Sequence, residues 1–127
     1  MHSFEELEAW KTARRLRACI SQTVKTLPNE EKYRLKDQMQ RSSRSVTANI
    51  AEGFGRFHFQ ENIQFCRHAR GSLTEILDHL ICANDEGYIK KEELDEYRNA
   101  ISGCLKILNG YIAYLKKAKE NAKQDQY

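Results

Sequence analysis

Apolar residues recur in steps of three or four along most of the chain, which is the spacing of helices that bury one face. The first such segment begins at Ser3, because Ser3 and Glu6 have the spacing of a capping box. It ends before Pro28, since proline lacks the N–H that a helix interior needs. The buried face predicted for residues 3–27 consists of Ala9, Ala13, Leu16, Ile20, Val24 and Leu27.

A second helix is expected from Asn29, which can cap it, to about Phe54. Glu30 and Glu31 would occupy its first turn, where the helix dipole favours negative charge. A pair of closely spaced glycines marks its end. The inner line predicted for this helix is Leu35, Met39, Ser43, Val46 and Ile50.

Two longer helices follow the glycine pair. The third is expected from about Gln60 to Glu86, with Gly87 as its C-terminal stop, and the fourth from about Lys91 to Lys119. The inner face of the third consists of Ile63, Cys66, Ala69, Leu73, Ile76, Leu77 and Leu80. The wide apolar face of the fourth consists of Leu94, Tyr97, Ile101, Cys104, Leu105, Leu108, Ile112 and Leu115.

Short connections between long helices place sequence neighbours antiparallel. No stretch alternates apolar and polar residues as a half-buried strand does. The expected fold class is therefore all-α, an antiparallel up-down-up-down four-helix bundle formed by residues 1–119. Residues 120–127 are expected to form a polar C-terminal tail that frays. A length of 127 residues fits one domain whose core needs no disulfide or metal.

Composition agrees with a helical protein, because the chain has one proline, six glycines and 31% charged residues. The first residues carry charges at short intervals, so no signal peptide is expected. No stretch approaches the roughly 20 apolar residues of a membrane span. We therefore expect a soluble, cytoplasmic protein without a membrane partner.

The four cysteines are too far apart for a CxxC motif and form no cluster with histidine at zinc spacing. Reduced thiols are therefore expected at Cys19, Cys66, Cys82 and Cys104. Cys66 and Cys104 fall on apolar helical faces, which predicts small core residues. The alternative for that pair is a reactive thiol.

The motifs of di-iron bundles and of nucleotide-binding loops are absent from the sequence. Di-iron bundles need Glu-x-x-His pairs, and no glutamate lies three residues before a histidine. The glycines near position 54 lack the third glycine and the preceding strand of a nucleotide-binding loop. We expect no catalytic residue, no cofactor and no metal. One metal candidate is Glu75 with His79, to which His68 could be added; the alternative is a solvated helix pair.

A stripe of small and apolar residues beside the core face of the fourth helix predicts self-association. It includes two glycines seven residues apart, which lower helix propensity without benefit to a monomer. Phe4 and Leu7, projected at about 100° per residue, point away from the core face of the first helix. The alternative is that the core face of the fourth helix is simply broad. The expected oligomer interface is Phe4, Leu7, Ala100, Gly103, Ile107, Gly110 and Tyr114.

The net charge of +3 is unevenly distributed, because the third helix is acidic and the other segments are basic. Lysines and arginines on outer faces could contact phosphates, which gives a candidate surface for RNA or DNA. The alternatives are a solvated face, or a protein–protein interaction scaffold with no nucleic-acid ligand. Sequence-specific recognition is not expected, because no recognition motif is present. The candidate phosphate contacts are Lys11, Arg14, Arg15, Arg41, Arg44, Lys116, Lys117 and Lys119.

Several ordered motifs together resemble one bacterial family. They are FEELEAW from residue 4, LPNEE at 27–31, NIAEGFGR at 49–56, ARGSLTE at 69–75 and ANDEGYI at 83–89. Over roughly residues 3–118 the chain resembles the four helix bundle proteins, which are encoded within intervening sequences of large-subunit ribosomal RNA genes. The accessory variability proteins of diversity-generating retroelements are relatives of this family.

The resemblance implies an antiparallel bundle assembled as a ring, a homopentamer, whose basic surface contacts nucleic acid. It implies no catalysis. Two positions depart from the family pattern: Lys90 stands where relatives offer a small polar cap, and residues 57–59 replace a more polar lead into the third helix. These departures concern helix ends and leave the expected fold unchanged.

Overall fold

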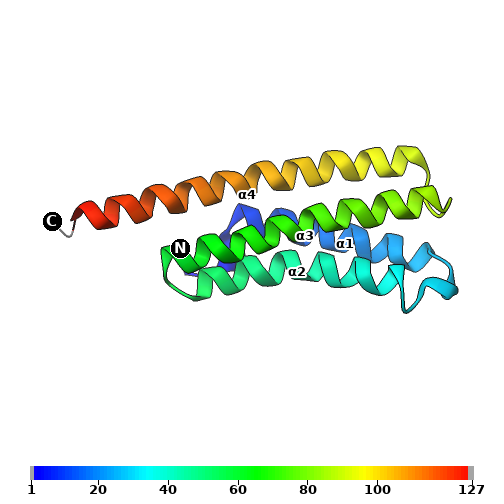
Figure 1. Ribbon diagram of the computed structural model, residues 1–127, viewed down its shortest axis with the longest axis horizontal. Coiled ribbons are helices and arrows are strands. Elements are labelled where there is room, and N and C mark those ends of the chain that lie inside the picture. Colours follow the sequence, from blue (N-terminus) through cyan, green and yellow to red (C-terminus); the bar gives the residue numbers. More distant parts are fainter. Residues whose placement is uncertain (1, 126–127) are drawn as a thin grey trace.

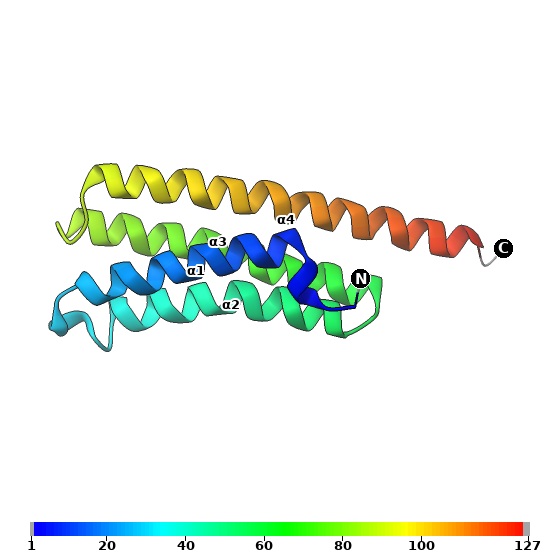
Figure 2. The same ribbon diagram turned by 180° about the vertical axis from the view of Figure 1, so that it is seen from behind.

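The computed structural model describes residues 2–125, with the side chains of residues 2–123, and these residues contain no strand. Its four helices are α1 (Glu8–Thr26), α2 (Leu35–Gly55), α3 (Phe59–Asp85) and α4 (Lys91–Asp125). Consecutive helices run in opposite directions and lie side by side (Figures 1 and 2). The predicted all-α, up-down-up-down four-helix bundle is confirmed.

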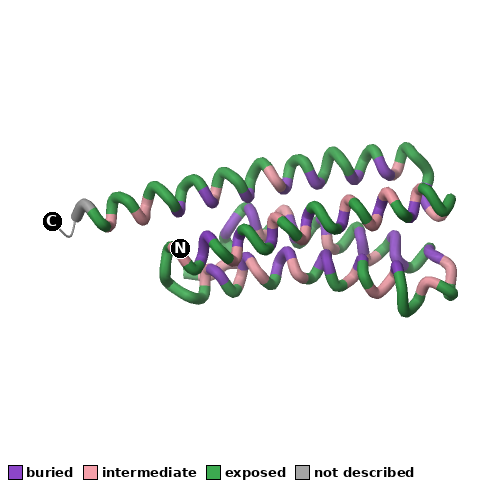
Figure 3. The backbone as a smooth tube through the Cα atoms, in the orientation of Figure 1, coloured by how far each residue is buried: buried purple, intermediate pink, exposed green. Residues whose placement is uncertain are grey.

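The core lies along the predicted inner lines, and buried positions face the bundle axis on each helix (Figure 3). α2 and α3 associate most extensively, whereas α1 and α4 meet over a shorter stretch. Leu77 and Leu105, predicted inside, are only partly buried against the core. The largest fully buried side chains are Ile20, Met39, Val46, Ile50, Ile63, Cys66, Leu73, Ile76, Leu80, Ile101 and Leu108.

The N-terminal segment differs from the prediction. The Ser3 Oγ accepts the Glu5 N–H at 3.1 Å and starts a short 3₁₀ helix, η1 (Phe4–Glu6), which ends at Leu7 with extended backbone (φ −70°, ψ 127°). Because this break separates η1 from α1, the projection of Phe4 and Leu7 along one continuous helix was wrong. Leu7 is 5% exposed in the core, and the Phe4 ring lies edge-on to Trp10 at 5.2 Å.

The second helix also begins later than predicted. Asn29 starts only a 3₁₀ turn, η2 (Asn29–Glu31), and Arg34 then adopts a non-helical backbone (φ −123°, ψ −106°). α2 therefore starts at Leu35. It ends at Gly55, close to the predicted position.

The turn between α2 and α3 is capped by a residue that the sequence pattern did not identify. The His58 Nδ1 accepts the Glu61 N–H at 3.4 Å and caps α3. Phe57, just before it, has a left-handed backbone with φ of 52°. Gly87 has φ of 78° directly after α3, so its predicted role as a stop is confirmed.

α4 is longer than predicted. It continues through Asp125, so the residues expected to form a polar tail are helical as far as they are described, and residues 126–127 lie outside the described part. The C-terminal part of α4 runs past the α2–α3 turn (Figure 1). At the other end of α4, the Lys90 carbonyl accepts the Leu94 N–H at 3.1 Å. Lys90, which replaces the small polar cap of the family pattern, thus contributes a backbone hydrogen bond to the start of the helix. No helix in residues 2–125 has the length and apolarity to cross a membrane.

Candidate functional site

The predicted phosphate contacts on α1 lie together on its outer face. Lys11, Arg14 and Arg15 are exposed and line a shallow hollow of about 430 Å³ together with Trp10. The Arg14 guanidinium carbon lies 5.5 Å from the centre of the Trp10 ring, and the Lys11 Nζ lies 3.7 Å from a Glu8 carboxylate oxygen. One exposed arginine of this group thus lies against an aromatic ring.

The predicted phosphate contacts on α2, Arg41 and Arg44, are also exposed, but only Arg41 has an acidic partner among the described side chains. The Arg41 Nε lies 3.0 Å from the Asp37 carboxylate, an exposed ion pair that adds little to stability. Among the side chains of residues 2–123, no carboxylate lies within 4.0 Å of Arg14, Arg15 or Arg44. These three arginines are therefore the predicted cations of α1 and α2 whose charge is not neutralised by a close acidic partner.

The predicted contacts on α4 lie at one end of the molecule. Lys116 and Lys117 are exposed, and the half-buried Lys119 donates through Nζ to the Gln60 Oε1 at 2.6 Å. Lys119 and Lys116 share a groove of about 260 Å³ with Arg67 of α3 and Lys123. Arg67 and Lys123 were not among the cations predicted from the sequence. The α3 segment as a whole is acidic, and periodicity alone does not show which of its residues face α4.

The eight predicted cations do not form one site. The first residues of α2 and the C-terminal part of α4 lie at opposite ends of the bundle (Figure 1). Arg41 and Arg44 belong to the first half of α2, whereas Lys116, Lys117 and Lys119 belong to the last part of α4. The structure therefore separates the candidate contacts into three groups, one each on α1, α2 and α4.

The stripe predicted for self-association is exposed over its whole length. Ile107 and Tyr114 keep 36% and 64% of their surface exposed, and Ala100 lies at the mouth of a groove of about 320 Å³ between α1 and α4. A Cβ added at Gly103 or Gly110 would meet no atom within 4 Å. The alternative of a broad core face is wrong for these positions, because the core line of α4 runs beside them.

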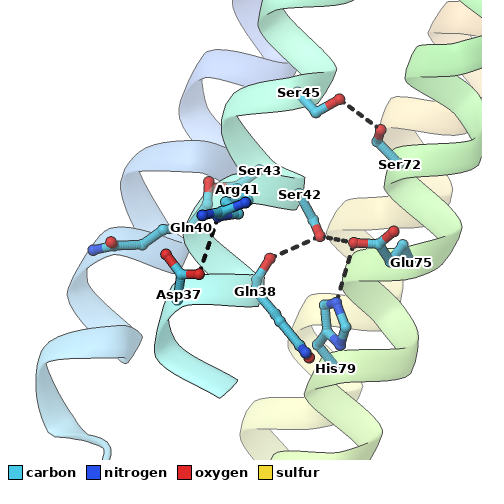
Figure 4. A network of polar contacts seen from close by, with 10 residues as sticks. All are labelled: Asp37, Gln38, Gln40, Arg41, Ser42, Ser43, Ser45, Ser72, Glu75 and His79. Atoms are coloured by element: carbon cyan, nitrogen blue, oxygen red, sulfur yellow. Dashed lines mark hydrogen bonds and ion pairs between the residues drawn. The ribbon is translucent and has the colours of Figure 1, made fainter. Parts of the chain in front are cut away.

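Glu75 connects α2 to α3 (Figure 4). One of its carboxylate oxygens accepts a hydrogen bond from the Ser42 hydroxyl of α2 and lies 3.2 Å from the His79 Nε2. The pKa of the Glu75 carboxyl is lowered, mainly by the hydrogen bond from Ser42. Burial, the next largest effect, raises this pKa, and the hydrogen bond and charge of His79 lower it further. The carboxylate stands between the serine and the imidazole, so this arrangement does not activate the serine as a nucleophile.

The metal candidate gains no third ligand. His68 lies edge-on to Phe65 at 6.3 Å, and no group of three or more His, Cys, Asp or Glu in the described residues could hold a metal ion. The polar contacts continue along the same helix pair, where the Ser72 hydroxyl donates to the Ser45 Oγ at 2.9 Å (Figure 4). Ser42, Ser45, Ser72 and Glu75 thus form a polar seam between α2 and α3.

All four cysteines are free. Cys66 and Cys104 are buried, as predicted for small core residues, whereas Cys19 and Cys82 are exposed. Burial raises the pKa of the Cys66 thiol to about 12 and also raises the pKa of Cys104. Both buried thiols are therefore protonated and inert, which argues against the reactive alternative.

Comparison with known proteins identifies the family. Residues 5–110 match the model of the 23S rRNA-intervening sequence protein family. The crystal structure of a protein with unknown function from the S23 ribosomal protein family of Bacteroides thetaiotaomicron matches with a TM-score of 0.76 at 24% sequence identity, covering 83% of this chain and 95% of that chain. At this identity the likeness shows the fold alone, and no curated protein matches. The family model covers most of the chain, which therefore belongs to the 23S rRNA-intervening sequence protein family.

Proposed function

We propose that this protein is a non-enzymatic homo-oligomer, a pentamer, that binds structured RNA or DNA through its basic outer faces. The observation that carries the proposal is the exposure of Arg14, Arg15 and Arg44 without a carboxylate within 4.0 Å in the described part of the chain. Such cations are available to phosphates at little desolvation cost. The family name, which refers to 23S rRNA, supports a nucleic-acid partner.

The exposed stripe on α4 supports self-association. Gly103 and Gly110 lower the helix propensity of α4, and neither is needed for packing inside one copy, because a Cβ at either position would meet no atom within 4 Å. A second copy that approaches the stripe closely would explain both glycines. The number five comes from the family resemblance.

Assembly would strengthen a weak electrostatic surface. One copy has a net charge of only +3, but a ring repeats each group of cations in every subunit. Repetition raises both the local potential and the effective concentration of contacts along one nucleic acid. The expected contacts are to the phosphate backbone, so binding should depend on shape and salt and little on base sequence.

Binding of labelled ribosomal RNA fragments and duplex DNA across a salt series tests the proposal. The variant R14A/R15A/R41A/R44A should lose affinity uniformly across sequences. Its slope of log affinity against log salt should fall by about 0.7 to 0.9 for each phosphate contact removed. Because these side chains lie outside the core, each substitution should change the free energy of unfolding by less than about 0.5 kcal/mol.

A control removes the same number of charges elsewhere. The variant K25A/K90A/K91A/R98A alters four exposed cations that the proposal does not use, and it should retain the affinity of the wild type. Unchanged affinity and salt slope in R14A/R15A/R41A/R44A would mean that the α1 and α2 cations only keep the surface solvated. The alternative function, a protein–protein interaction scaffold without a nucleic-acid ligand, would then be favoured, because the exposed α4 stripe supports it as well.

A further inference from the structure

Three of the most exposed large apolar side chains lie at one end of the bundle. Phe57, Phe59 and Tyr114 have 87%, 39% and 64% of their surface exposed. Phe57 belongs to the α2–α3 turn, Phe59 begins α3, and Tyr114 lies on the part of α4 that passes this turn. A hollow of about 470 Å³ joins them, with walls formed by Leu7, Phe54, Phe57, Phe59, Tyr111 and Tyr114.

The backbone of Phe57 is strained. Its φ of 52° is in the left-handed region, which is a genuine outlier for a bulky residue. Such a conformation is unfavourable and is kept where the surroundings enforce it. The enforced conformation leaves the ring in water, with Phe54 as a ring neighbour at 6.1 Å. Burial in the core therefore does not explain this phenylalanine.

Positively charged side chains border the end of the bundle that carries Phe57, Phe59 and Tyr114, which we call the aromatic end. A second hollow of about 300 Å³ includes Phe57 and Phe59 and adds Lys119 and Lys123 of α4. The groove that holds Arg67 and Lys116 shares Lys119 and Lys123 with this second hollow, and Glu120 is the acidic side chain in its lining. The first two hollows share Phe57 and Phe59, and the second hollow shares Lys119 and Lys123 with the groove, so the aromatic rings and the cations are neighbours.

The geometry points to unpaired nucleotides of a nucleic acid as the occupant of this end. Bases would stack on Phe57 and Phe59, and Lys116, Lys119, Lys123 and Arg67 would contact the adjacent phosphates. Exposed rings beside cations suit a strand in which flat bases alternate with phosphates, and stacking tolerates any base sequence. The inference rests on the proposed function and assigns it a site that the outer cations of α1 and α2 do not provide.

The test compares binding of a fluorescein-labelled 12-nucleotide single strand with binding of the corresponding blunt duplex by anisotropy. The variant Phe57→Asn with Phe59→Ala removes two rings, and asparagine tolerates the left-handed backbone at position 57. Single-strand affinity should fall about 30-fold or more, the low end of the cost of losing two stacked bases, while duplex affinity changes less than about twofold. A 2-aminopurine base in the strand should be quenched by the wild type and less by the variant.

Tyr33→Asn is the matched control, because Tyr33 is 84% exposed beside the Lys32 ammonium, at 5.3 Å from the ring centre, in the α1–α2 connection. This variant should bind the single strand as the wild type does. Circular dichroism melting verifies that both variants fold.

The outcomes separate the two proposals. A wild type that binds duplex but not the single strand, or a double variant with unchanged single-strand affinity, overturns this inference and leaves the proposed function standing. A wild type that binds neither overturns both. A double variant with a lower assembly mass in sedimentation identifies the aromatic end as a contact between copies, which also overturns the inference.

Discussion

The side-chain amide of Asn62 on α3 donates a hydrogen bond from Nδ2 to the phenolic oxygen of Tyr111 on α4 at 3.0 Å. Asn62 is only 7% exposed, and its Oδ1 accepts from the Cys66 thiol at 3.6 Å. The same Oδ1 would lie 2.7 Å from a Cβ added at Gly53 of α2. This buried amide thus bonds α3 to α4 and lies close to Gly53 of α2, beneath Phe57 and Phe59.

Removing this amide should destabilise the bundle. Asn62→Ala leaves the half-buried Tyr111 hydroxyl without its partner and opens a small cavity, so the free energy of unfolding should fall by about 1 to 3 kcal/mol. Tyr111→Phe should cost about 0.5 to 1.5 kcal/mol. Urea denaturation of both single variants and of the double variant measures the coupling. Fully additive effects would contradict a direct bond.

Gly53 should not tolerate a side chain. In Gly53→Ala the new methyl group would meet Asn62 and lie 2.9 Å from the Phe65 Cβ, so we expect a loss of about 1 to 3 kcal/mol. Gly71→Ala on α3 is the control, because a Cβ there meets nothing within 4 Å. The control should gain up to about 1 kcal/mol from helix propensity. Equal thermal stability of the two variants would contradict the close approach of α2 and α3.

The bond from Ser42 to Glu75 should make stability depend on pH. The folded state lowers the pKa of the Glu75 carboxyl, so the stabilisation is present above the ordinary pKa of a glutamate and is lost as the pH falls through the lowered value. Because this side chain is 58% exposed, solvent screening limits the contribution to less than about 1 kcal/mol. Urea denaturation measures the free energy of unfolding of the wild type and of Glu75→Gln. The wild type should be more stable than the variant by a larger margin at pH 6 than at pH 3. The free energy of unfolding of Ser42→Ala should depend on pH in the same direction as that of the wild type, but less strongly. A difference between wild type and Glu75→Gln that grows towards pH 3 would contradict a lowered pKa of Glu75.

Charges placed on the exposed α4 stripe should dissociate the assembly. The variant G103E/G110E should sediment as a smaller species than the wild type with its helical content largely intact, because neither position contacts the core of its own copy. S102E/N109E places the same charges on another face of α4 and should leave the mass unchanged. A wild type that is monomeric at micromolar concentration would refute the self-association that motivates this experiment.

Sequence periodicity predicted the number of helices, their order and most core residues, because burial of one helical face requires apolar side chains every three or four positions. It placed the N-terminal ends of the first two helices too early. Ser3 and Asn29 have side chains suited to capping, but each starts only a 3₁₀ turn, and Leu7 then enters the core from an extended backbone. Local signals do not show whether a turn continues, since packing against other helices decides it.

The sequence by itself determined that this chain forms a helical bundle with an apolar stripe left over on its last helix and with cations on outer faces. Only the tertiary structure decided which of these side chains meet. Phe57 and Lys123 are far apart in sequence, and they share one hollow because α4 continues past the α2–α3 turn. The physical reason is that periodicity specifies which face of a helix is buried, whereas its length and its neighbours specify what its exposed face lies beside.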